Sequence, residues 1–152
     1  MKIVVGRQNE LFGPWIAQQL ATQWFPGRGE TVGLLDTEKG PIAGALYEGY
    51  NGASVIVHLA KLPSSQFSHE FLWFGSYYPF VQLGVKKLIA PVESTNLRSK
   101  RFTEHYGFTL EATLKDAAEG GDLLLYTMMK EDCPWLSLKG LKNEQTQSSG
   151  AA

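Results

Sequence analysis

Residues 85–108 read VKKLIAPVESTNLRSKRFTEHYGF, and this stretch predicts a strand followed directly by a helix. The apolar run at residues 85–92 is typical of a buried strand. Thr95 or Asn96 can begin the helix, because either side chain can accept a hydrogen bond from a backbone N–H group of the first turn. Gly107 stands where a helix commonly ends on a left-handed residue, so the helix is expected between these points.

Three cations lie in the first turns of this predicted helix, at Arg98, Lys100 and Arg101. The positive end of a helix dipole disfavours cations, so their position needs an explanation. A bound anion would supply one, because Arg98 and Arg101 are three residues apart on one face and a guanidinium matches a pair of phosphate oxygens. An ordinary solvated helix surface would supply another, and the residue pattern alone favours it.

The composition is that of one globular domain. The chain has 152 residues, 43% hydrophobic and 19% charged, with a formal net charge of −1. These values allow a real core, whereas nucleic-acid and membrane-surface binders need a basic excess. No apolar run is long enough to span a bilayer, and no His, Asp and Glu cluster has metal-ligand spacing. Cys133 is the only cysteine, which excludes an intramolecular disulfide and fits a packed side chain in a reducing cytoplasm.

The remaining segments predict an α+β fold, with a mixed and mostly antiparallel sheet and flanking helices. Pro14 is expected in the first turn of a helix that continues through residues 15–24. Ser68 is expected to cap a second, buried helix that is kinked near Pro79. The domain is expected to span residues 1–138, followed by a disordered polar tail at 139–152. The predicted strands are residues 2–7, 31–36, 41–49, 53–62, 85–92, 108–116 and 122–130.

Residues 80–136 resemble the second half of GNAT-superfamily acyl-CoA N-acyltransferases. The likeness is greatest to the branch with the ribosomal-protein N-terminal acetyltransferases and the short acetyltransferases of bacteria and phages. The first half of the chain agrees with this family in element order only. The matching pieces are QLGVKKL at 82–88, Asn96, YGF at 106–108, GD at 121–122 and YTMMKEDCPWL at 126–136.

The resemblance implies that acetyl-CoA binds as co-substrate in a splayed gap between two parallel strands, residues 53–62 and 85–92. The pyrophosphate would lie over backbone N–H groups at the start of the buried helix, where the helix dipole is positive. Backbone N–H groups near Leu59 to Lys61 would polarise the thioester carbonyl. The cofactor-binding residues implied are Leu59, Lys61, Gln66, Ser68, His69, Asn96, Arg98 and Arg101.

The chain departs from the family pattern in two places. The segment SSQFSHEF at residues 64–71 has no glycine where the family has a glycine-containing phosphate loop. Thr103 occupies the position where many relatives have a tyrosine that protonates the leaving thiolate. A catalytically degenerate acyl-CoA-binding or protein-interaction module is therefore the alternative to an active N-acetyltransferase.

Amine acetylation needs a base, and His58 is the first candidate because its ordinary pKa lies near neutral pH. It lies mid-strand in SVIVHLA, on the strand that would line the gap, although one histidine on a strand is also compatible with a core or surface position. Glu48 and Glu111 are alternative bases. Their positions beside a turn and on a late strand favour ordinary exposed charges.

Two hydroxyls are candidates for protonating the thiolate that leaves when an amine attacks acetyl-CoA. Ser99 lies one turn into the basic helix, where it can equally be a small packing residue. Tyr126 lies in the strand LLLYTMM, where it can equally be a core aromatic. Both alternatives stay open for each residue.

The acceptor amine is expected to be a protein N-terminus, a lysine or a small amine. Its binding loops are expected at QWFPGRGE, residues 23–30, and at the hairpin tip AAEGG, residues 117–121. The aromatic residues between Phe71 and Phe80 indicate core, with a few members reaching the surface to shape an acceptor pocket or a homodimer face. Carboxylates available to a cationic acceptor are Glu30, Glu119 and Asp122.

Overall fold

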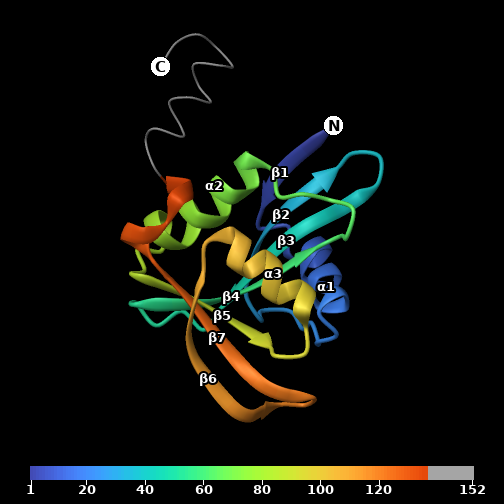
Figure 1. The fold of residues 1–152 in the computed structure, drawn as a ribbon. Helices are drawn as coiled ribbons and strands as arrows, with labels where there is room; N and C mark the ends of the chain where they lie inside the picture. Colours follow the sequence, from blue (N-terminus) through green and yellow to red (C-terminus); the bar gives the residue numbers. More distant parts are fainter. Residues whose placement is uncertain (137–152) are drawn as a thin grey trace.

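The computed structural model describes residues 1–136, in which seven strands form one sheet with the order β1-β2-β3-β4-β5-β7-β6 (Figure 1). Neighbouring strands are antiparallel except β4 and β5, which are parallel. The mixed sheet expected from the sequence is therefore confirmed. The predicted tail at 139–152 lies outside the described residues. The strands are β1 Lys2–Gly6, β2 Glu30–Asp36, β3 Gly40–Glu48, β4 Ser54–Lys61, β5 Lys87–Glu93, β6 Thr109–Ala118 and β7 Gly121–Met129.

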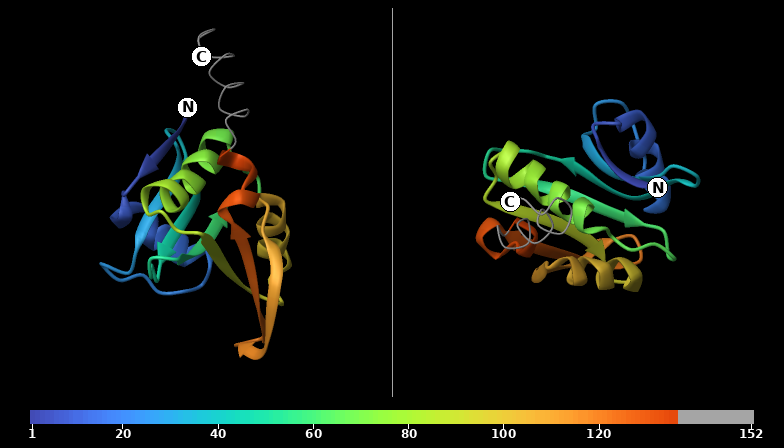
Figure 2. Two further views of the ribbon diagram at one scale, coloured as in Figure 1. Left: turned by 90° about the vertical axis from the view of Figure 1, so that its left-hand side faces the viewer. Right: turned by 90° about the horizontal axis from the view of Figure 1, so that it is seen from above.

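Helices pack on both faces of this sheet. The helix α1, Asn9–Gln19, buries Phe12 and Ile16 against Leu46 and Ala60 of β3 and β4. The opposite face carries the main core, to which α2, His69–Tyr77, and α3, Leu97–Tyr106, contribute. Figure 2 shows α1 and α3 on opposite sides of the sheet. Short turns complete the chain: a π-helical turn η1 at Tyr78–Gln82, and 3-10 turns η2 at Lys130–Asp132 and η3 at Pro134–Leu136.

The helix α1 begins five residues earlier than the sequence suggests, so the expectation that Pro14 opens the helix is wrong. Pro14 lies inside the helix, in its second turn. Tertiary contacts explain this, because the Phe12 ring packs where a side chain at Gly33 would otherwise be and Asn9 accepts hydrogen bonds from the backbone and hydroxyl of Thr31 at 2.9 and 2.8 Å. These contacts outweigh the loss of one helical hydrogen bond at proline. The helix also ends earlier than expected, because Ala21 adopts a left-handed φ of 54°.

The two helices around the predicted cofactor region form as their sequences indicate. Ser68 caps α2, its hydroxyl accepting from the Phe71 N–H at 3.1 Å. Beyond it, Pro79 lies in the π-helical turn η1, which is how the helix accommodates the missing donor. Asn96 caps α3 by accepting from the Ser99 N–H at 3.1 Å, and Gly107 ends it with φ of 121°.

The parallel strands β4 and β5 separate part-way along their length. Their ladder runs from Ser54 opposite Lys87 to Ile56 opposite Ile89 and stops there. Both strands continue for several residues beyond that point, to Lys61 and Glu93. The backbone groups on this edge of β4 then lack a ladder partner on β5, so the sheet contains a gap in its centre. No helix among residues 1–136 is long and apolar enough to cross a membrane.

Candidate active site

Three adjoining cavities follow the gap between β4 and β5. The first, here called the cationic cavity, has a volume of about 740 Å³ and lies between the β4–α2 loop and α3. The second, here called the strand-gap cavity, has a volume of about 230 Å³ and lies between the separated strands. A small cavity of about 80 Å³ shares Lys61, Arg98 and Phe102 with the first. It shares Leu20, Asn96 and Ser99 with the strand-gap cavity, so the three cavities adjoin one another along the gap.

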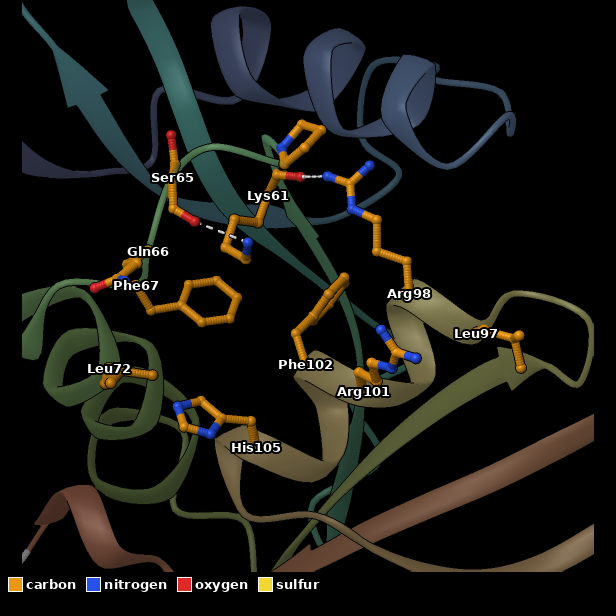
Figure 3. A pocket seen from close by; sticks show the side chains of 11 residues that line it. Lys61, Ser65, Gln66, Phe67, Leu72, Leu97, Arg98, Arg101, Phe102 and His105 are labelled. Carbon is orange, nitrogen blue, oxygen red and sulfur yellow. Dashed lines mark hydrogen bonds between the residues drawn. The ribbon is translucent and has the colours of Figure 1, made fainter.

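The cationic cavity concentrates positive groups and contains no carboxylate. Its lining includes Lys61, Arg98, Arg101 and His105, and neither aspartate nor glutamate is among the lining residues. Figure 3 shows these side chains around the rings of Phe67 and Phe102. Burial, and then the nearby charge of Arg98, lowers the pKa of Lys61. A cavity in which cations repel one another favours a bound anion.

The structure separates the three cations of α3. Arg98 and Arg101 line the cationic cavity, whereas Lys100 is not among its lining residues. The Arg98 guanidinium donates from Nη2 to the backbone carbonyl of Lys61, which ties α3 to the end of β4. Lys61 in turn donates from Nζ to the Ser65 carbonyl at 2.8 Å. Arg98 and Lys61 are thus held at the cavity wall by backbone acceptors rather than by carboxylates.

The loop before α2 approaches the same cavity with a different set of groups. Gln66 lines the cavity, and Ser68 lies behind it as the helix cap. His69 points elsewhere: its ring lies edge-on to Trp135, with ring centroids 5.9 Å apart. The structure therefore brings Gln66, but not the side chains of Ser68 and His69, into the lining of the cationic cavity.

The strand-gap cavity brings together residues from both faces of the sheet. His58 and Leu59 of β4 line it with Ala90 of β5, and α3 contributes three neutral side chains. Arg28, from the loop between α1 and β2, lines it from the α1 side. The cavity therefore passes through the sheet. The α3 side chains are Asn96, Ser99 and Thr103, of which Ser99 and Thr103 are buried.

His58 belongs to a hydrogen-bonded group that the sequence did not indicate. Its Nε2 lies 2.5 Å from the Glu48 carboxylate. Arg28 donates two hydrogen bonds to the same carboxylate, from Nη2 at 3.0 Å and from Nε at 3.3 Å. Glu48 is therefore neither an isolated base nor a solvent-facing charge, since its side chain is 24% exposed and paired on both sides.

Burial and charge set the protonation of this group. Burial lowers the pKa of His58, and the attraction of Glu48, which favours the protonated ring, offsets this only in part. Burial raises the pKa of Glu48, but its hydrogen bond with Arg28 and the nearby His58 and Arg28 charges outweigh burial, and the net shift is downward. At neutral pH the arrangement is a neutral imidazole beside an ionised carboxylate, which suits a proton acceptor.

Two of the predicted candidates lie away from these cavities. The Tyr126 hydroxyl donates to Glu104 at 2.7 Å beneath α3, and burial followed by this carboxylate raises its pKa to about 12. Glu111 lies on the exposed face of β6, 2.7 Å from Lys87 and 2.9 Å from the Thr127 hydroxyl. Neither residue lines any of the three cavities.

The candidate acceptor carboxylates are also dispersed. Glu30 lies beside Asn9, whose amide donates to it at 3.1 Å, in a separate cavity of about 370 Å³ that also contains Glu48. Asp122 accepts from the Asp116 N–H at 3.0 Å within the terminal hairpin, and Glu119 is exposed at the tip of that hairpin. The structure therefore does not gather the three into one site.

Arg28 is the main site residue that sequence reasoning missed. It stands in the loop at residues 23–30, where the sequence indicated a break between elements and an acceptor-binding loop but singled out no role for Arg28. Its partner Glu48 is twenty residues away, and no local pattern links the two. The flanking glycines are the one available signal, because they allow the loop to lie close against β3.

The chain is similar in structure to solved N-acetyltransferases. No family model and no curated protein matches the chain. Among solved structures, spermidine/spermine N-acetyltransferase SpeG from Vibrio cholerae aligns with a TM-score of 0.67 at 13% identity, covering 86% of this chain and 93% of the other. A chimera of the Vibrio cholerae enzyme with hSSAT aligns with a TM-score of 0.65 at 16% identity, covering 90% and 99%.

The chain has the GNAT fold. At these identities the likeness concerns the fold, and it confirms the expected architecture with its single parallel pair, β4 and β5. The family resemblance implied that acetyl-CoA binds between these two strands. The strand-gap cavity lies between the same strands.

Proposed function

We propose that the protein is an N-acetyltransferase that transfers an acetyl group from acetyl-CoA to a primary amine. The amine attacks the thioester directly while both substrates are bound. The observation that carries this proposal is the series of adjoining cavities that runs from the cationic cavity to the neutral His58. The GNAT fold supports it, as do the structural neighbours, which are named as N-acetyltransferases.

The cationic cavity fits the phosphates of acetyl-CoA. Arg98 and Arg101 offer guanidinium groups to phosphate oxygens, and Lys61 adds an ammonium. Gln66 supplies an amide on the α2 side, although the loop around it has no glycine. Since no carboxylate lines this cavity, nothing there opposes a phosphate. When bound, acetyl-CoA supplies the acetyl group as an activated thioester.

The small cavity and the strand-gap cavity fit the narrower part of the cofactor. Asn96 lines both and is proposed to contact the pantetheine arm while it caps α3. The edge of β4 beyond Ile56 has no ladder partner on β5, which leaves backbone groups near Leu59 available to polarise a carbonyl. These residues orient the thioester in the gap between the strands.

Two side chains of the strand-gap cavity are proposed to move protons. His58 accepts the proton that the attacking amine loses, because its ring is neutral at neutral pH. Ser99 lines the cavity from α3 and is proposed to donate a proton to the departing thiolate. Tyr126 fits this role less well, since its hydroxyl is directed to Glu104 outside the cavity.

A small amine is the proposed acceptor, reaching His58 from the side of the α1–β2 loop. The structural neighbours from Vibrio cholerae are named for spermidine and spermine, which are small amines. The strand-gap cavity of about 230 Å³ is lined on this side by Leu20, Thr22 and Arg28. Protein N-termini and lysines are the other acceptors to include in a test.

The first experiment is calorimetric titration of the purified chain with acetyl-CoA and with dephospho-CoA, followed by an assay of CoA release with a panel of amines. Micromolar binding of acetyl-CoA and release that depends on an amine are the expected results. Binding without release on any small amine, lysine peptide or N-terminal peptide would instead favour the degenerate binding module. An absence of binding up to millimolar acetyl-CoA would overturn the proposal.

A further inference from the structure

The Glu48 carboxylate lies between the guanidinium of Arg28 and the imidazole of His58 and is hydrogen-bonded to both. We propose that Arg28 and Glu48 are positioning residues that fix His58 in the tautomer whose Nδ1 receives the acceptor's proton. The role of His58 as base rests on the proposed function. The tautomer rests on the hydrogen bonds that Glu48 makes with His58 and Arg28, and it does not depend on turnover.

The loop between α1 and β2 is built to place Arg28 against β3. Gly27 adopts φ of 85°, a left-handed conformation that other residues rarely take. At Gly29 an added Cβ would lie 2.2 Å from the backbone oxygen of Tyr47, so only glycine permits this close approach. The two glycines thus hold Arg28 next to Glu48, the last residue of β3.

The Arg28 side chain uses all of its nitrogens in this position. Nε and Nη2 donate to the two oxygens of Glu48, at 3.3 and 3.0 Å. Nη1 donates to the backbone carbonyl of Gln23 and lies 3.5 Å from the Thr22 hydroxyl. Its side chain is only 11% exposed. Such a paired and nearly buried guanidinium is an anchor for the carboxylate rather than a ligand for a substrate anion.

The register of β3 and β4 brings Glu48 to His58. Glu48 lies opposite Ile56, and Leu46 lies opposite His58, so the glutamate and the histidine are diagonal neighbours on the same face. The ionised carboxylate can only accept, so the Nε2 of His58, 2.5 Å away, must donate. In a neutral ring the other nitrogen, Nδ1, then has a free lone pair.

Arg28 and Glu48 act on the charge of His58 in opposite directions. Glu48 favours the protonated ring, whereas Arg28 opposes it. Arg28 lines the strand-gap cavity, and the other charged residue that lines this cavity is Glu93 of β5. From α3 the cavity receives Asn96, Ser99 and Thr103, and from the end of α1 it receives Leu20, all uncharged. The two positioning residues therefore form the nearest pair of opposed charges around the base.

NMR of the chain labelled with ¹⁵N-histidine tests the tautomer without requiring turnover. His58→Gln identifies the His58 signals among the three histidines of the sequence. We expect a neutral ring at neutral pH, protonated at Nε2 and unprotonated at Nδ1. A ring protonated at Nδ1 would overturn the inference, and so would a fully charged imidazolium at neutral pH.

Two substitutions should move the titration of His58 in opposite directions. Arg28→Gln removes the charge that opposes protonation, so the His58 titration should shift to higher pH. Glu48→Gln removes the charge that favours it, so the titration should shift to lower pH. The acid limb of kcat/KM should follow each shift, with a loss of roughly tenfold at neutral pH in Arg28→Gln. Shifts in the same direction, or none, would contradict the inference, because a purely structural role predicts no opposed pair.

Two further variants keep the test decisive. Arg7→Gln is the matched control: Arg7 is 75% exposed and lies 3.9 Å from Glu30, so its loss should move neither the titration nor kcat/KM. Arg28→Lys keeps the charge if Arg28→Gln does not fold, and should retain a titration close to that of the wild type. A wild-type chain without turnover but with the expected tautomer would overturn the proposed function and leave this inference standing.

Discussion

The cationic cavity and the surroundings of His58 use charge in opposite ways. The cationic cavity is lined by Lys61, Arg98 and Arg101 and by no carboxylate. Lys61 and Arg98 donate hydrogen bonds to backbone carbonyls. Around His58, the carboxylate of Glu48 meets both a guanidinium and an imidazole. The cationic cavity carries an excess of positive charge, whereas beside His58 the positive charge of Arg28 is paired with the negative charge of Glu48.

This difference indicates what each region is suited to do. An excess of positive charge lowers the cost of binding an anion, and it is relieved when that anion arrives. A neutral histidine beside an ionised carboxylate can accept a proton, and the carboxylate then lies against the imidazolium that forms. The two regions lie at opposite ends of a series of adjoining cavities, which is the arrangement that the proposed transfer from an anionic acyl donor to an amine requires.

The largest expected effect comes from removing His58, the proposed base. His58→Ala should lower turnover about 100-fold or more, the usual contribution of a general base, while acetyl-CoA binding stays unchanged. Steady-state kinetics and calorimetry measure the two quantities. Because burial lowers the pKa of His58, the wild-type rate should fall only when pH drops below the ordinary histidine range, as the ring becomes protonated.

Glu111→Gln provides the comparison for that variant. Glu111 was an alternative base, but it lies on the exposed face of β6 beside Lys87 and lines none of the three cavities. Its substitution should leave turnover and the pH profile as they are. Equal losses in His58→Ala and Glu111→Gln would remove the distinction between a balanced site and an ordinary surface charge.

A smaller effect is expected from the cationic cavity. Replacing both Arg98 and Arg101 with alanine should weaken acetyl-CoA binding by roughly tenfold or more, because the loss of even one charged hydrogen bond to phosphate costs about 1.5–3 kcal/mol. Dephospho-CoA should be affected less if either arginine contacts the 3′-phosphate. Lys100→Ala is the matched control on the same helix, since Lys100 does not line the cavity. Equal weakening of both ligands would place the arginines on the pyrophosphate rather than the 3′-phosphate, and unchanged binding of both would return them to an ordinary helix surface.

The sequence anticipated the parts of the fold that depend on local pattern. The three consecutive strands β2 to β4, the Ser68 and Asn96 caps and the Gly107 stop are all predicted from local features, and the structure has them. The start of α1 was missed because distant residues decide it. Phe12 packs on Gly33, and that contact places Pro14 inside the helix despite its local preference.

The candidate site divides along the same line. Arg98 and Arg101 were noticed because their position in one helix is locally unusual, and both line the cationic cavity. Arg28 was missed because its significance depends on Glu48 and His58, which two other strands bring to it. Only the register of β3 and β4, together with the close approach at Gly29, makes these three residues neighbours.

The smallest expected effect concerns Asn96, where the two regions meet. Asn96 caps α3 and also lines the path between the cavities, so its side chain has two separable roles. Asn96→Ala should lower the free energy of unfolding by about 1 kcal/mol, the usual cost of a lost cap. Asn96→Ser should restore stability, because serine caps helices well. If the serine variant regains stability in denaturant unfolding but still binds acetyl-CoA more weakly than wild type, the amide contacts the cofactor. If it regains both, Asn96 serves α3 alone, and the path between the two regions needs no polar contact there.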